Sequence, residues 1–427
     1  MSDDTDDEAL YPNRGRATRP TGVSRRRLLS GSAAAGAAVT AGCMGSTTDD
    51  SGGDGDAEGT IFVFNTDEKT VSVIDAATHE VVATPHLGAT ASFPSNQYAP
   101  GLTDEPTNPL WLNVDRGVRA IEVGSLSSVA AVETGSGANW QELTPDGAHL
   151  VVSAREPAHT QYRIDADRES GSFGEVTAEI DRADEGGIGD RDGPGPCDVT
   201  IHPDGAYAYV PDIFGDTLSV IDVEAFELAE QVAVSPTDGA DAARPWMGTA
   251  APDGETLLVE HDEGATGTES VWDVSDPAAP VERARLTADD GLGRRPLTSE
   301  IGPDSAFGYV FTPGSNDVTV LDLDARAVAD RLDVGGSAFV GTWGPSRERL
   351  YVPVQTADEV AVIDHADREV VETIPVGSRP YGATAATARP DGDAAANVRG
   401  TMASLGIDLD DGGTTYCIGN CACGHRL

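Results

Sequence analysis

The chain has 427 residues, and its 72 acidic side chains against 28 basic ones give it a formal net charge of −44 at pH 7. Because 39% of the residues are hydrophobic, the chain can still bury a core, so the composition indicates a globular protein with a strongly acidic surface. Binding to nucleic-acid phosphates requires a basic stripe, and the sequence has none. The composition therefore argues against a nucleic-acid partner.

Arginine supplies nearly all of the positive charge, since Lys69 is the only lysine. Strong acidity with almost no lysine resembles the composition of proteins from extreme halophiles. We therefore interpret the acidic surface as an adaptation to salt rather than as a binding surface.

Residues 1–42 are expected to form an export signal. Arg25 and Arg26 precede a short Ala/Gly-rich apolar run, which is too short to span a membrane and resembles a twin-arginine signal. The run ends in Thr-Ala-Gly before Cys43, which resembles a lipobox and implies cleavage before Cys43 and a lipid on its thiol. The alternative is an ordinary signal peptide with a chance cysteine. Residues 43–58 are rich in Gly, Ser and Asp and are expected to form a flexible acidic tether, so we predict anchoring to the outer face of the cytoplasmic membrane.

Two short phrases recur along the rest of the chain. A strand-like phrase ending in Asp occurs at Ser72–Asp75, Ser219–Asp222, Ser270–Asp273, Thr319–Asp322 and Ala361–Asp364. A turn phrase resembling Pro-Asp-Gly contains Pro145, Pro203, Pro252, Pro303, Pro345 and Pro390, which lie 58, 49, 51, 42 and 45 residues apart. A period of roughly 40–50 residues built from short β-branched runs is typical of a β-propeller blade.

The fold prediction is an all-β, seven-bladed propeller over residues 59–392. In the segment 196–234, four alternating strands are separated by turn residues, as one blade requires. The first blade lacks an inner strand, and residues 379–392 can supply one, which would close the ring with strands from both ends of the chain. The second blade is degenerate and the third carries an insertion, so six or eight blades are alternatives.

Four blades carry a phrase that can be compared with a known family. Phe62-Val-Phe-Asn, Tyr209-Val-Pro-Asp, Tyr309-Val-Phe-Thr and Tyr351-Val-Pro-Val resemble the YVTN-type β-propeller repeat. Proteins with this repeat include exported archaeal and bacterial surface proteins, and the resemblance here is to exported haloarchaeal surface lipoproteins. The haem-binding propeller of cytochrome cd1-type nitrite reductases looks similar in shape. The resemblance implies a propeller and an extracytoplasmic setting, and a fold alone does not give a function.

One mouth of the central channel is a candidate ligand site. Alignment of the inner strands places six residues at one equivalent position: Asn139, Cys197, Trp246, Leu297, Phe339 and Tyr381. Arg244, Arg295 and Arg379 stand two places earlier, each directly before a proline. With Trp246 and Tyr381 behind them, three arginines would suit a small anionic ligand or a protein partner, because guanidinium groups bind carboxylate or phosphate in bidentate fashion. The alternative is that each arginine opens a strand and pairs with a nearby carboxylate.

Asp198 and His261 complete the candidate residues of this mouth, and we expect His261 in a loop. A haem site built from His159, His202 or His261 is an alternative, although the chain has no CxxCH attachment motif.

Residues 393–427 follow the repeats and form a Cys-rich tail. Cys417, Cys421, Cys423 and His425 stand in a CxxxCxCxH pattern, which offers three thiolates and an imidazole to zinc or monovalent copper. Two alternatives remain open: two of these cysteines form a disulfide while the third pairs with Cys197, or the tail is a disordered redox-active appendage.

These observations favour a lipid-anchored propeller that acts as a binding or interaction module at the cell surface, with a metal or redox function in its tail. The alternatives are a propeller oxidoreductase that carries a haem-like or metal cofactor, and a structural component of the cell envelope.

Overall fold

The computed structural model describes residues 59–87, 100–114, 116–136, 138–189 and 191–392. The chain divides into two units, Met1–Asp56 and Ala57–Leu427, and the first lies entirely outside the described residues. Within the described part, no helical segment has the length and apolar character that a membrane crossing needs. The two helices in this part are short 3-10 turns, η1 (Pro100–Thr103) and η2 (Ala288–Asp290).

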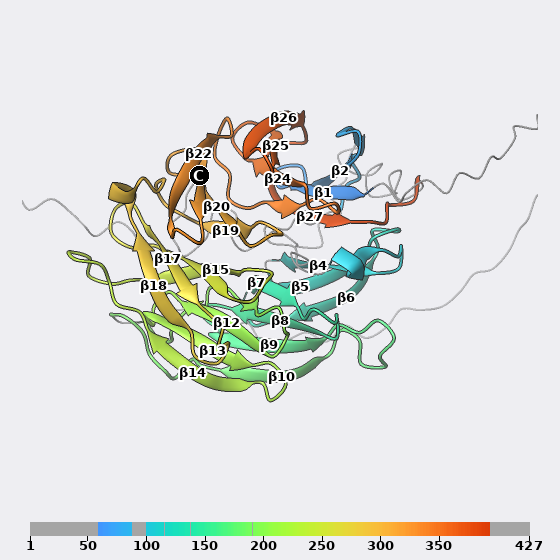
Figure 1. Ribbon diagram of the computed structural model, residues 1–427. Helices are drawn as coiled ribbons and strands as arrows, with labels where there is room; N and C mark the ends of the chain where they lie inside the picture. Colours follow the sequence, from blue (N-terminus) through green and yellow to red (C-terminus); the bar gives the residue numbers. More distant parts are fainter. Residues whose placement is uncertain (1–58, 88–99, 115, 137, 190, 393–427) are drawn as a thin grey trace, which may run out of the picture. The chain divides into compact units, whose positions relative to one another are not determined.

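The described strands form seven antiparallel sheets, which confirms the predicted seven-bladed β-propeller (Figure 1). The sheet that combines the first and last described strands contains β27 (Pro380–Ala386), β1 (Thr60–Asn65), β2 (Thr70–Asp75) and β3 (Val81–Ala83). The next contains β4 (Pro109–Val114), β5 (Gly117–Glu122) and β6 (Ser128–Glu133). The third contains β7 (Ala138–Leu143), β8 (His149–Ala154), β9 (Thr160–Asp165) and β10 (Val176–Asp181). The fourth contains β11 (Thr200–Ile201), β12 (Tyr207–Asp212), β13 (Thr217–Asp222) and β14 (Glu227–Ala233).

The remaining three sheets repeat the same order from the inner to the outer strand. The fifth contains β15 (Pro245–Ala250), β16 (Thr256–His261), β17 (Thr268–Asp273) and β18 (Val281–Leu286). The sixth contains β19 (Thr298–Ile301), β20 (Phe307–Thr312), β21 (Asp317–Asp322) and β22 (Ala327–Asp333). The seventh contains β23 (Thr342–Trp343), β24 (Arg349–Val354), β25 (Glu359–Asp364) and β26 (Glu369–Pro375).

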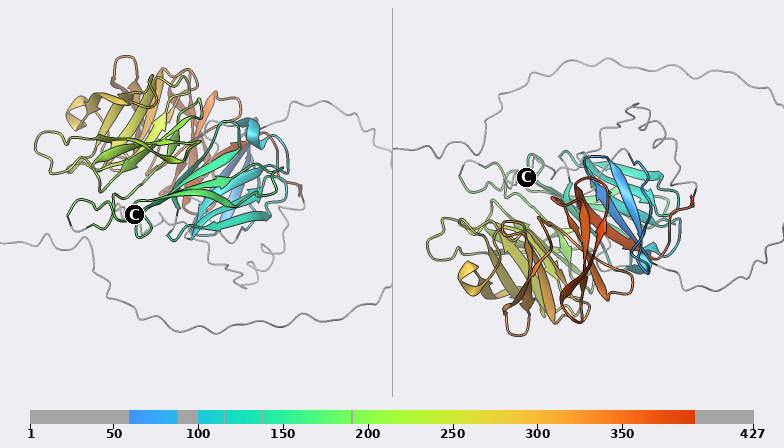
Figure 2. Two further views of the ribbon diagram at one scale, coloured as in Figure 1. Left: turned by 90° about the horizontal axis from the view of Figure 1, so that it is seen from below. Right: turned by 90° about the horizontal axis from the view of Figure 1, so that it is seen from above.

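Strands from the two ends of the propeller close the ring. β27 pairs antiparallel with β1, with Ile61 opposite Ala385 and Val63 opposite Ala383. Figures 1 and 2 show these strands, red and blue, side by side. The predicted closure is therefore confirmed, and β27 supplies the inner strand of the first sheet.

The Pro-Asp-Gly phrase forms the turn between the first and second strands of a blade. The carboxylate of Asp204 accepts a hydrogen bond of 2.8 Å from the backbone N–H of Ala206, and Asp253 accepts the same bond from Glu255 at 2.9 Å. Gly254 has φ 73°, a left-handed conformation in which a residue without a Cβ avoids a steric penalty. The same left-handed conformation recurs at Ser305 and Arg347, which stand in place of the glycine in two copies, so the backbone geometry of the turn is kept even where the glycine is not.

The aspartate that ends the strand-like phrase closes the turn between the third and fourth strands of a blade. Asp222 accepts a 2.8 Å bond from the backbone N–H of Ala225, and Asp322 accepts one of 2.8 Å from Ala325. Asp364 does the same with Asp367 at 2.8 Å. An Asx-type turn of this kind requires a short carboxylate at one position, which explains why the phrase always ends in Asp.

The repeated tyrosine of the second strand links one blade to the next. The Tyr209 hydroxyl donates to the carbonyl of Pro277 at 3.1 Å, and the Tyr351 hydroxyl donates to that of Ala76 at 3.2 Å. The Tyr309 hydroxyl lies 2.8 Å from Nδ1 of His365. All three partners lie in or beside the turn before the outer strand of the following blade. The repeated tyrosine therefore makes an equivalent contact between neighbouring blades in each of these copies.

The hydrophobic core lies mainly between neighbouring sheets. Tyr209 and Leu218 of the fourth sheet pack with Leu257 and Trp272 of the fifth, for example. Inner strands such as β15 and β27 therefore bury both faces, whereas outer strands such as β14 are largely exposed.

Candidate functional site

The three candidate arginines share one backbone conformation. Arg244, Arg295 and Arg379 have φ of 45°, 57° and 51°, and each stands directly before the proline that leads into an inner strand. The left-handed conformation costs a non-glycine residue about 1–2 kcal/mol. A backbone hydrogen bond offsets part of this cost, since the N–H of Arg244 donates to Asp216 at 2.7 Å and that of Arg379 donates to Asp358 at 2.8 Å.

Arg244 and Arg295 meet at a single carboxylate. Oδ2 of Asp262 lies 3.9 Å from Nη1 of Arg244, and Oδ1 lies 4.0 Å from Nη2 of Arg295. The arginine side chains are 47% and 44% exposed and that of Asp262 is 26% exposed. Within the described part of the chain, neither guanidinium donates a side-chain hydrogen bond, so their N–H groups remain accessible to a ligand from solvent.

The pKa of Asp262 is set by two opposing effects, its burial and the two neighbouring arginines. Burial raises the pKa of Asp262 to about 6, against the opposing effects of Arg295 and Arg244. The group therefore changes charge near neutral pH, and its protonation removes the negative charge that Asp262 places beside the two arginines.

Arg379 lies at another carboxylate. Its Nη1 is 3.4 Å from Oδ1 of Asp67, and the two side chains are 35% and 50% exposed. The structure thus brings two of the three arginines together at one carboxylate and places the third at another. Each arginine therefore lies beside a carboxylate, as the alternative interpretation describes.

The aromatic candidates are buried in an apolar cluster. Trp246 is 1% exposed and Tyr381 is 5% exposed, and the ring of Tyr381 lies 5.1 Å from that of Phe339. Cys197, Leu297 and Phe339 belong to the same cluster, so five of the six residues that sequence alignment placed at equivalent positions converge. They contribute to the core and do not form an exposed wall behind the arginines.

Asp198 is a buried structural carboxyl. Its Oδ1 accepts a hydrogen bond from the N–H of Val199 and its Oδ2 accepts one from Gly248 of β15, both at 2.6 Å. Burial raises the pKa of Asp198 well above its usual value. The side chain is 1% exposed and connects the fourth blade with the fifth.

His261 is the last residue of β16, whereas the sequence suggested a loop. Its Nε2 lies 2.8 Å from Oγ of Ser270, and its Nδ1 lies 3.2 Å from the carbonyl oxygen of Ala243. Burial lowers the pKa of His261 well below its usual value, so the imidazole is neutral. This contact resembles a nucleophile and its base, but both side chains are 0% exposed and cannot reach a substrate. The pair is therefore structural.

The other histidines named for a haem site lie apart in the fold. Nδ1 of His159 accepts a hydrogen bond from the N–H of Gly195 at 3.2 Å, and Nε2 of His202 lies 3.0 Å from the carbonyl oxygen of Gly254. Among the described residues, no group of three or more His, Cys, Asp or Glu side chains could hold a metal ion. Cys43, Cys417, Cys421, Cys423 and His425 lie outside the described residues.

Comparisons with known proteins identify the fold. No protein-family model and no curated protein matches the chain. The solved structures that match include a periplasmic gluconolactonase from Pseudomonas aeruginosa, with 17% identity and a TM-score of 0.60 over 77% of this chain and 99% of the other. A putative 6-phosphogluconolactonase from Bacteroides fragilis matches with 16% identity and a TM-score of 0.58 over 79% and 99% of the two chains. Kuenenia stuttgartiensis hydrazine synthase matches with 18% identity and a TM-score of 0.55 over 72% and 92%.

This chain has the propeller fold of those proteins. Their names describe different activities. At identities of 16–18%, the comparison shows that the folds are similar and does not assign an activity to this chain.

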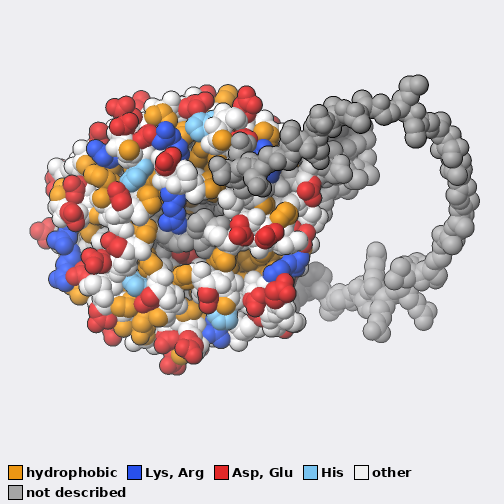
Figure 3. Space-filling view, turned by 45° about the vertical axis from the view of Figure 1, so that its right-hand side comes forward, with side chains coloured by type: hydrophobic (Ala, Val, Ile, Leu, Met, Phe, Trp, Pro, Cys, Tyr) orange, Lys and Arg blue, Asp and Glu red, His pale blue; other side chains and the backbone are white. Residues whose placement is uncertain are grey.

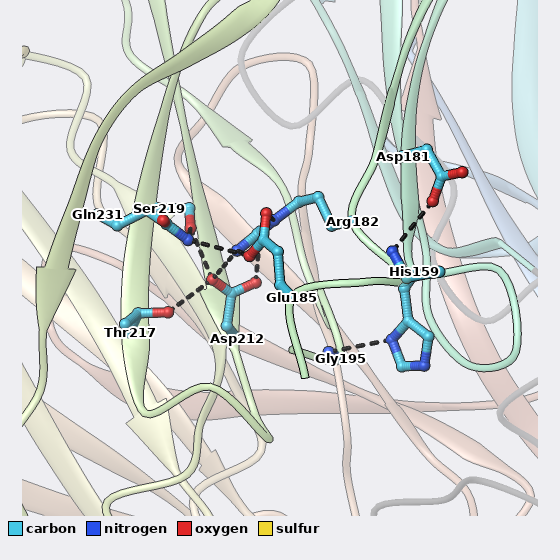
Figure 4. A network of polar contacts seen from close by, with 10 residues as sticks. His159, Asp181, Arg182, Glu185, Gly195, Asp212, Thr217, Ser219 and Gln231 are labelled. Atoms are coloured by element: carbon cyan, nitrogen blue, oxygen red, sulfur yellow. Dashed lines mark hydrogen bonds and ion pairs between the residues drawn. The ribbon is translucent and has the colours of Figure 1, made fainter. Parts of the chain in front are cut away.

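A buried network of ion pairs and hydrogen bonds joins the third blade to the fourth (Figure 4), and the sequence repeats do not predict it. Both terminal nitrogens of Arg182 donate to the carboxylate of Asp212, at 2.8 and 2.9 Å, and Nε and Nη2 donate to Glu185 at 3.0 and 2.9 Å. Asp212 also accepts from Thr217 at 2.8 Å and from Ser219 at 2.6 Å. Because Arg182 follows β10 in the inserted segment of the third blade, no repeat pattern identifies it. Its side chain is 0% exposed and its donors are engaged, which indicates a role in holding the insertion.

Proposed function

We propose that this protein is an exported, lipid-anchored binding module that takes a small anionic ligand, a carboxylate or a phosphate, between Arg244 and Arg295. One observation carries the proposal: two guanidinium groups from successive blades lie about half exposed beside one carboxylate, with no side-chain hydrogen bond within the described residues. The planar guanidinium matches the two oxygens of a carboxylate or phosphate, so a pair can hold one anion from two sides.

The acidic surface makes such a pair unusual for this protein. The chain carries a formal net charge of −44, and Figure 3 shows acidic side chains spread over the visible face, with few Lys and Arg side chains among them. A general attraction for anions is therefore excluded, and an anion requires a local arrangement of cations.

Ligand binding by the wild type and single variants tests the proposal. We expect gluconate, citrate, phosphate or sulfate, titrated calorimetrically, to bind the wild type, and Arg244→Ala or Arg295→Ala to weaken that binding about ten- to hundredfold. This range corresponds to about 1.5–3 kcal/mol for a hydrogen bond to a charged group. Arg379→Ala is the matched control, because it removes the same side chain from the same backbone conformation at a different carboxylate. Equal losses in all three variants, or no binding by the wild type, would contradict the proposal.

Lactone hydrolysis is a second candidate function, favoured by the chemistry of Asp262. A carboxylate whose pKa is about 6 can accept a proton from water near neutral pH, and the two arginines can stabilise the negative charge on a carbonyl oxygen. Two of the structural neighbours are named as a gluconolactonase and a putative 6-phosphogluconolactonase. Hydrolysis of gluconolactone above its spontaneous rate by the wild type, lost in Asp262→Asn, would support this function.

The remaining assignments are also proposals. Residues 1–42 would direct export by the twin-arginine route, Cys43 would carry the lipid, and Cys417, Cys421, Cys423 and His425 would hold zinc or copper. Mass spectrometry of the membrane-extracted protein tests the lipid, and metal analysis with a thiol count, repeated on Cys421→Ser, tests the tail. Strong visible absorption by the purified protein would instead support the haem-carrying oxidoreductase, and a protein with neither ligand nor metal would support the structural envelope component.

A further inference from the structure

Two buried glutamates face each other inside the propeller. Glu260 of β16 stands directly opposite Glu269 of β17 in the antiparallel register, so both side chains lie on the same face of the fifth sheet. Both residues are 0% exposed. Within the described residues, none of their four carboxylate oxygens has a hydrogen-bond partner.

The face that carries the two glutamates packs against the sixth blade. Leu258 and Val271, the next opposed pair on that face, are buried with Ile301 of β19. Ser299 stands two residues before Ile301 and therefore presents its side chain to the same interface. The glutamate pair thus lies between the fifth and sixth blades, beside the first half of β19.

Ser299 supplies a second, independent observation. It is 2% exposed, and its hydroxyl oxygen makes no well-formed hydrogen bond in the described structure. A weak hydrogen-bonding contact with Ser299 lowers the pKa of Glu260 against the larger opposing effect of burial, so the hydroxyl lies beside that carboxyl. A buried hydroxyl in this position can present its oxygen to a cation.

The cation that acts electrostatically on Glu269 does not neutralise the pair. Arg285 lowers the pKa of Glu269, which burial and Glu260 raise well above its usual value. The guanidinium of Arg285, however, donates to Glu282 at 2.8 Å and to Glu263 at 2.9 Å. Arg285 also stands opposite Ser270, which is on the other face of the sheet from Glu269. Two buried carboxylates at neighbouring positions cannot both carry charge unless a cation compensates them.

We propose that Glu260, Glu269 and Ser299 form a binding site between two blades for a hard, oxygen-preferring cation, best fitted by Ca²⁺. Two carboxylates balance the charge of a divalent ion, and all five side-chain ligand atoms are oxygens, whereas zinc or copper would select imidazole or thiolate. Ca²⁺ accepts bidentate carboxylates and irregular geometry, while Mg²⁺ demands a near-ideal octahedron. The ion would link the β16–β17 hairpin to β19 and would not depend on any ligand at Arg244 and Arg295.

Thermal unfolding in the presence of added cations tests this site. The full-length protein is first treated with a chelator and then measured in 1 M KCl with CaCl₂, MgCl₂ or additional NaCl, because high salt screens weak binding to the acidic surface. We expect CaCl₂ to raise the Tm of the wild type by several degrees and MgCl₂ to raise it less. Equilibrium dialysis in the same buffer should find one tightly bound Ca²⁺ per chain.

Charge-neutral variants locate the ion. Glu260→Gln and Glu269→Gln keep the shape of the side chain, and each should weaken Ca²⁺ binding at least about tenfold and abolish the shift in Tm. Glu230→Gln, which changes an exposed glutamate of β14 by the same charge, should leave both unchanged. Circular dichroism checks that each variant folds. If a variant does not fold, equilibrium dialysis of the wild type alone shows whether the protein binds Ca²⁺.

Three results would overturn the proposal. The first is a wild type that binds no Ca²⁺ in 1 M KCl, and the second is a Tm shift that Glu260→Gln and Glu269→Gln retain. The third is a wild type whose Tm is independent of Ca²⁺ but falls as pH rises through 8, since that behaviour indicates two carboxyl groups that share a proton.

Discussion

The Arg182–Asp212 network allows a prediction of stability that can be worked from its contacts. Replacing Arg182 with Leu removes two hydrogen bonds from each of Asp212 and Glu185 and leaves the Asp212 carboxylate, which is 0% exposed, with only Thr217 and Ser219 as partners. Leaving one member of a buried ion pair without its partner costs about 3–5 kcal/mol. We therefore expect Arg182→Leu to lower the free energy of unfolding by about that amount, measured by urea denaturation followed by circular dichroism.

Two comparisons make this prediction specific. Arg283→Leu removes an exposed arginine that lies 2.7 Å from Asp273, and such a surface pair contributes about 0.2–1 kcal/mol. Arg182→Leu combined with Asp212→Asn should be more stable than Arg182→Leu alone, because the neutral amide still accepts hydrogen bonds from Thr217 and Ser219 and no longer buries a charge.

The pH dependence of the stability of Arg182→Leu provides a further check of the prediction. Burial raises the pKa of Asp212 even with Arg182 present, and the loss of Arg182 removes an effect that lowers it. The folded variant then binds a proton more readily than the unfolded chain, so its stability falls as pH rises above the ordinary range for Asp. The deficit of Arg182→Leu should therefore be larger at pH 8 than at pH 4.5. A deficit no larger than that of Arg283→Leu, or one independent of pH, would refute this reasoning.

Three other predictions follow from single contacts. Sulfate, which stays doubly charged from pH 5 to pH 8, should bind several-fold more tightly below about pH 6, where Asp262 is protonated, and Asp262→Asn should bind it equally at both pH values. Tyr309→Phe should lose about 1 kcal/mol of stability with its bond to His365, whereas Tyr207→Phe, whose hydroxyl makes no hydrogen bond among the described residues, should lose less; equal losses would contradict the link between blades. Gly254→Ala should cost about 1–2 kcal/mol, because φ is 73° and the new Cβ would lie 2.7 Å from Nε2 of His202. An unchanged Tm in that variant would show that the turn can relax.

The pattern of elements could be predicted from the sequence because it rests on interactions between residues close in the chain. The Asp222 turn closes within three residues, and the turn that contains Gly254 needs only its own backbone and the preceding Asp253. Such local rules recur with the repeat and identify blades and strand ends. Closure by β27 also followed, because the first blade lacked an inner strand and residues 379–392 could supply it.

The candidate site was predictable only in part, for a geometric reason. The similar placement of Arg244, Arg295 and Arg379 before a proline is visible in the sequence, and the three residues share a positive φ. Whether such residues meet depends on the acidic residues that the neighbouring loops supply, and these loops differ from blade to blade. Asp262 joins the first two, and Asp67 holds the third elsewhere.

Burial was also decided by the tertiary structure. Trp246 and Tyr381 begin inner strands, where sequence offers no distinction between a channel wall and a core, and the convergence of several blades buries both. The opposed pair of Glu260 and Glu269 depends on the register of β16 with β17, and its closeness to Ser299 depends on how the sixth blade packs against the fifth. The sequence by itself therefore determined the blades, their turns and the closure of the ring. The tertiary structure decided which side chains from different blades meet, because those distances depend on the packing of whole sheets and not on spacing along the chain.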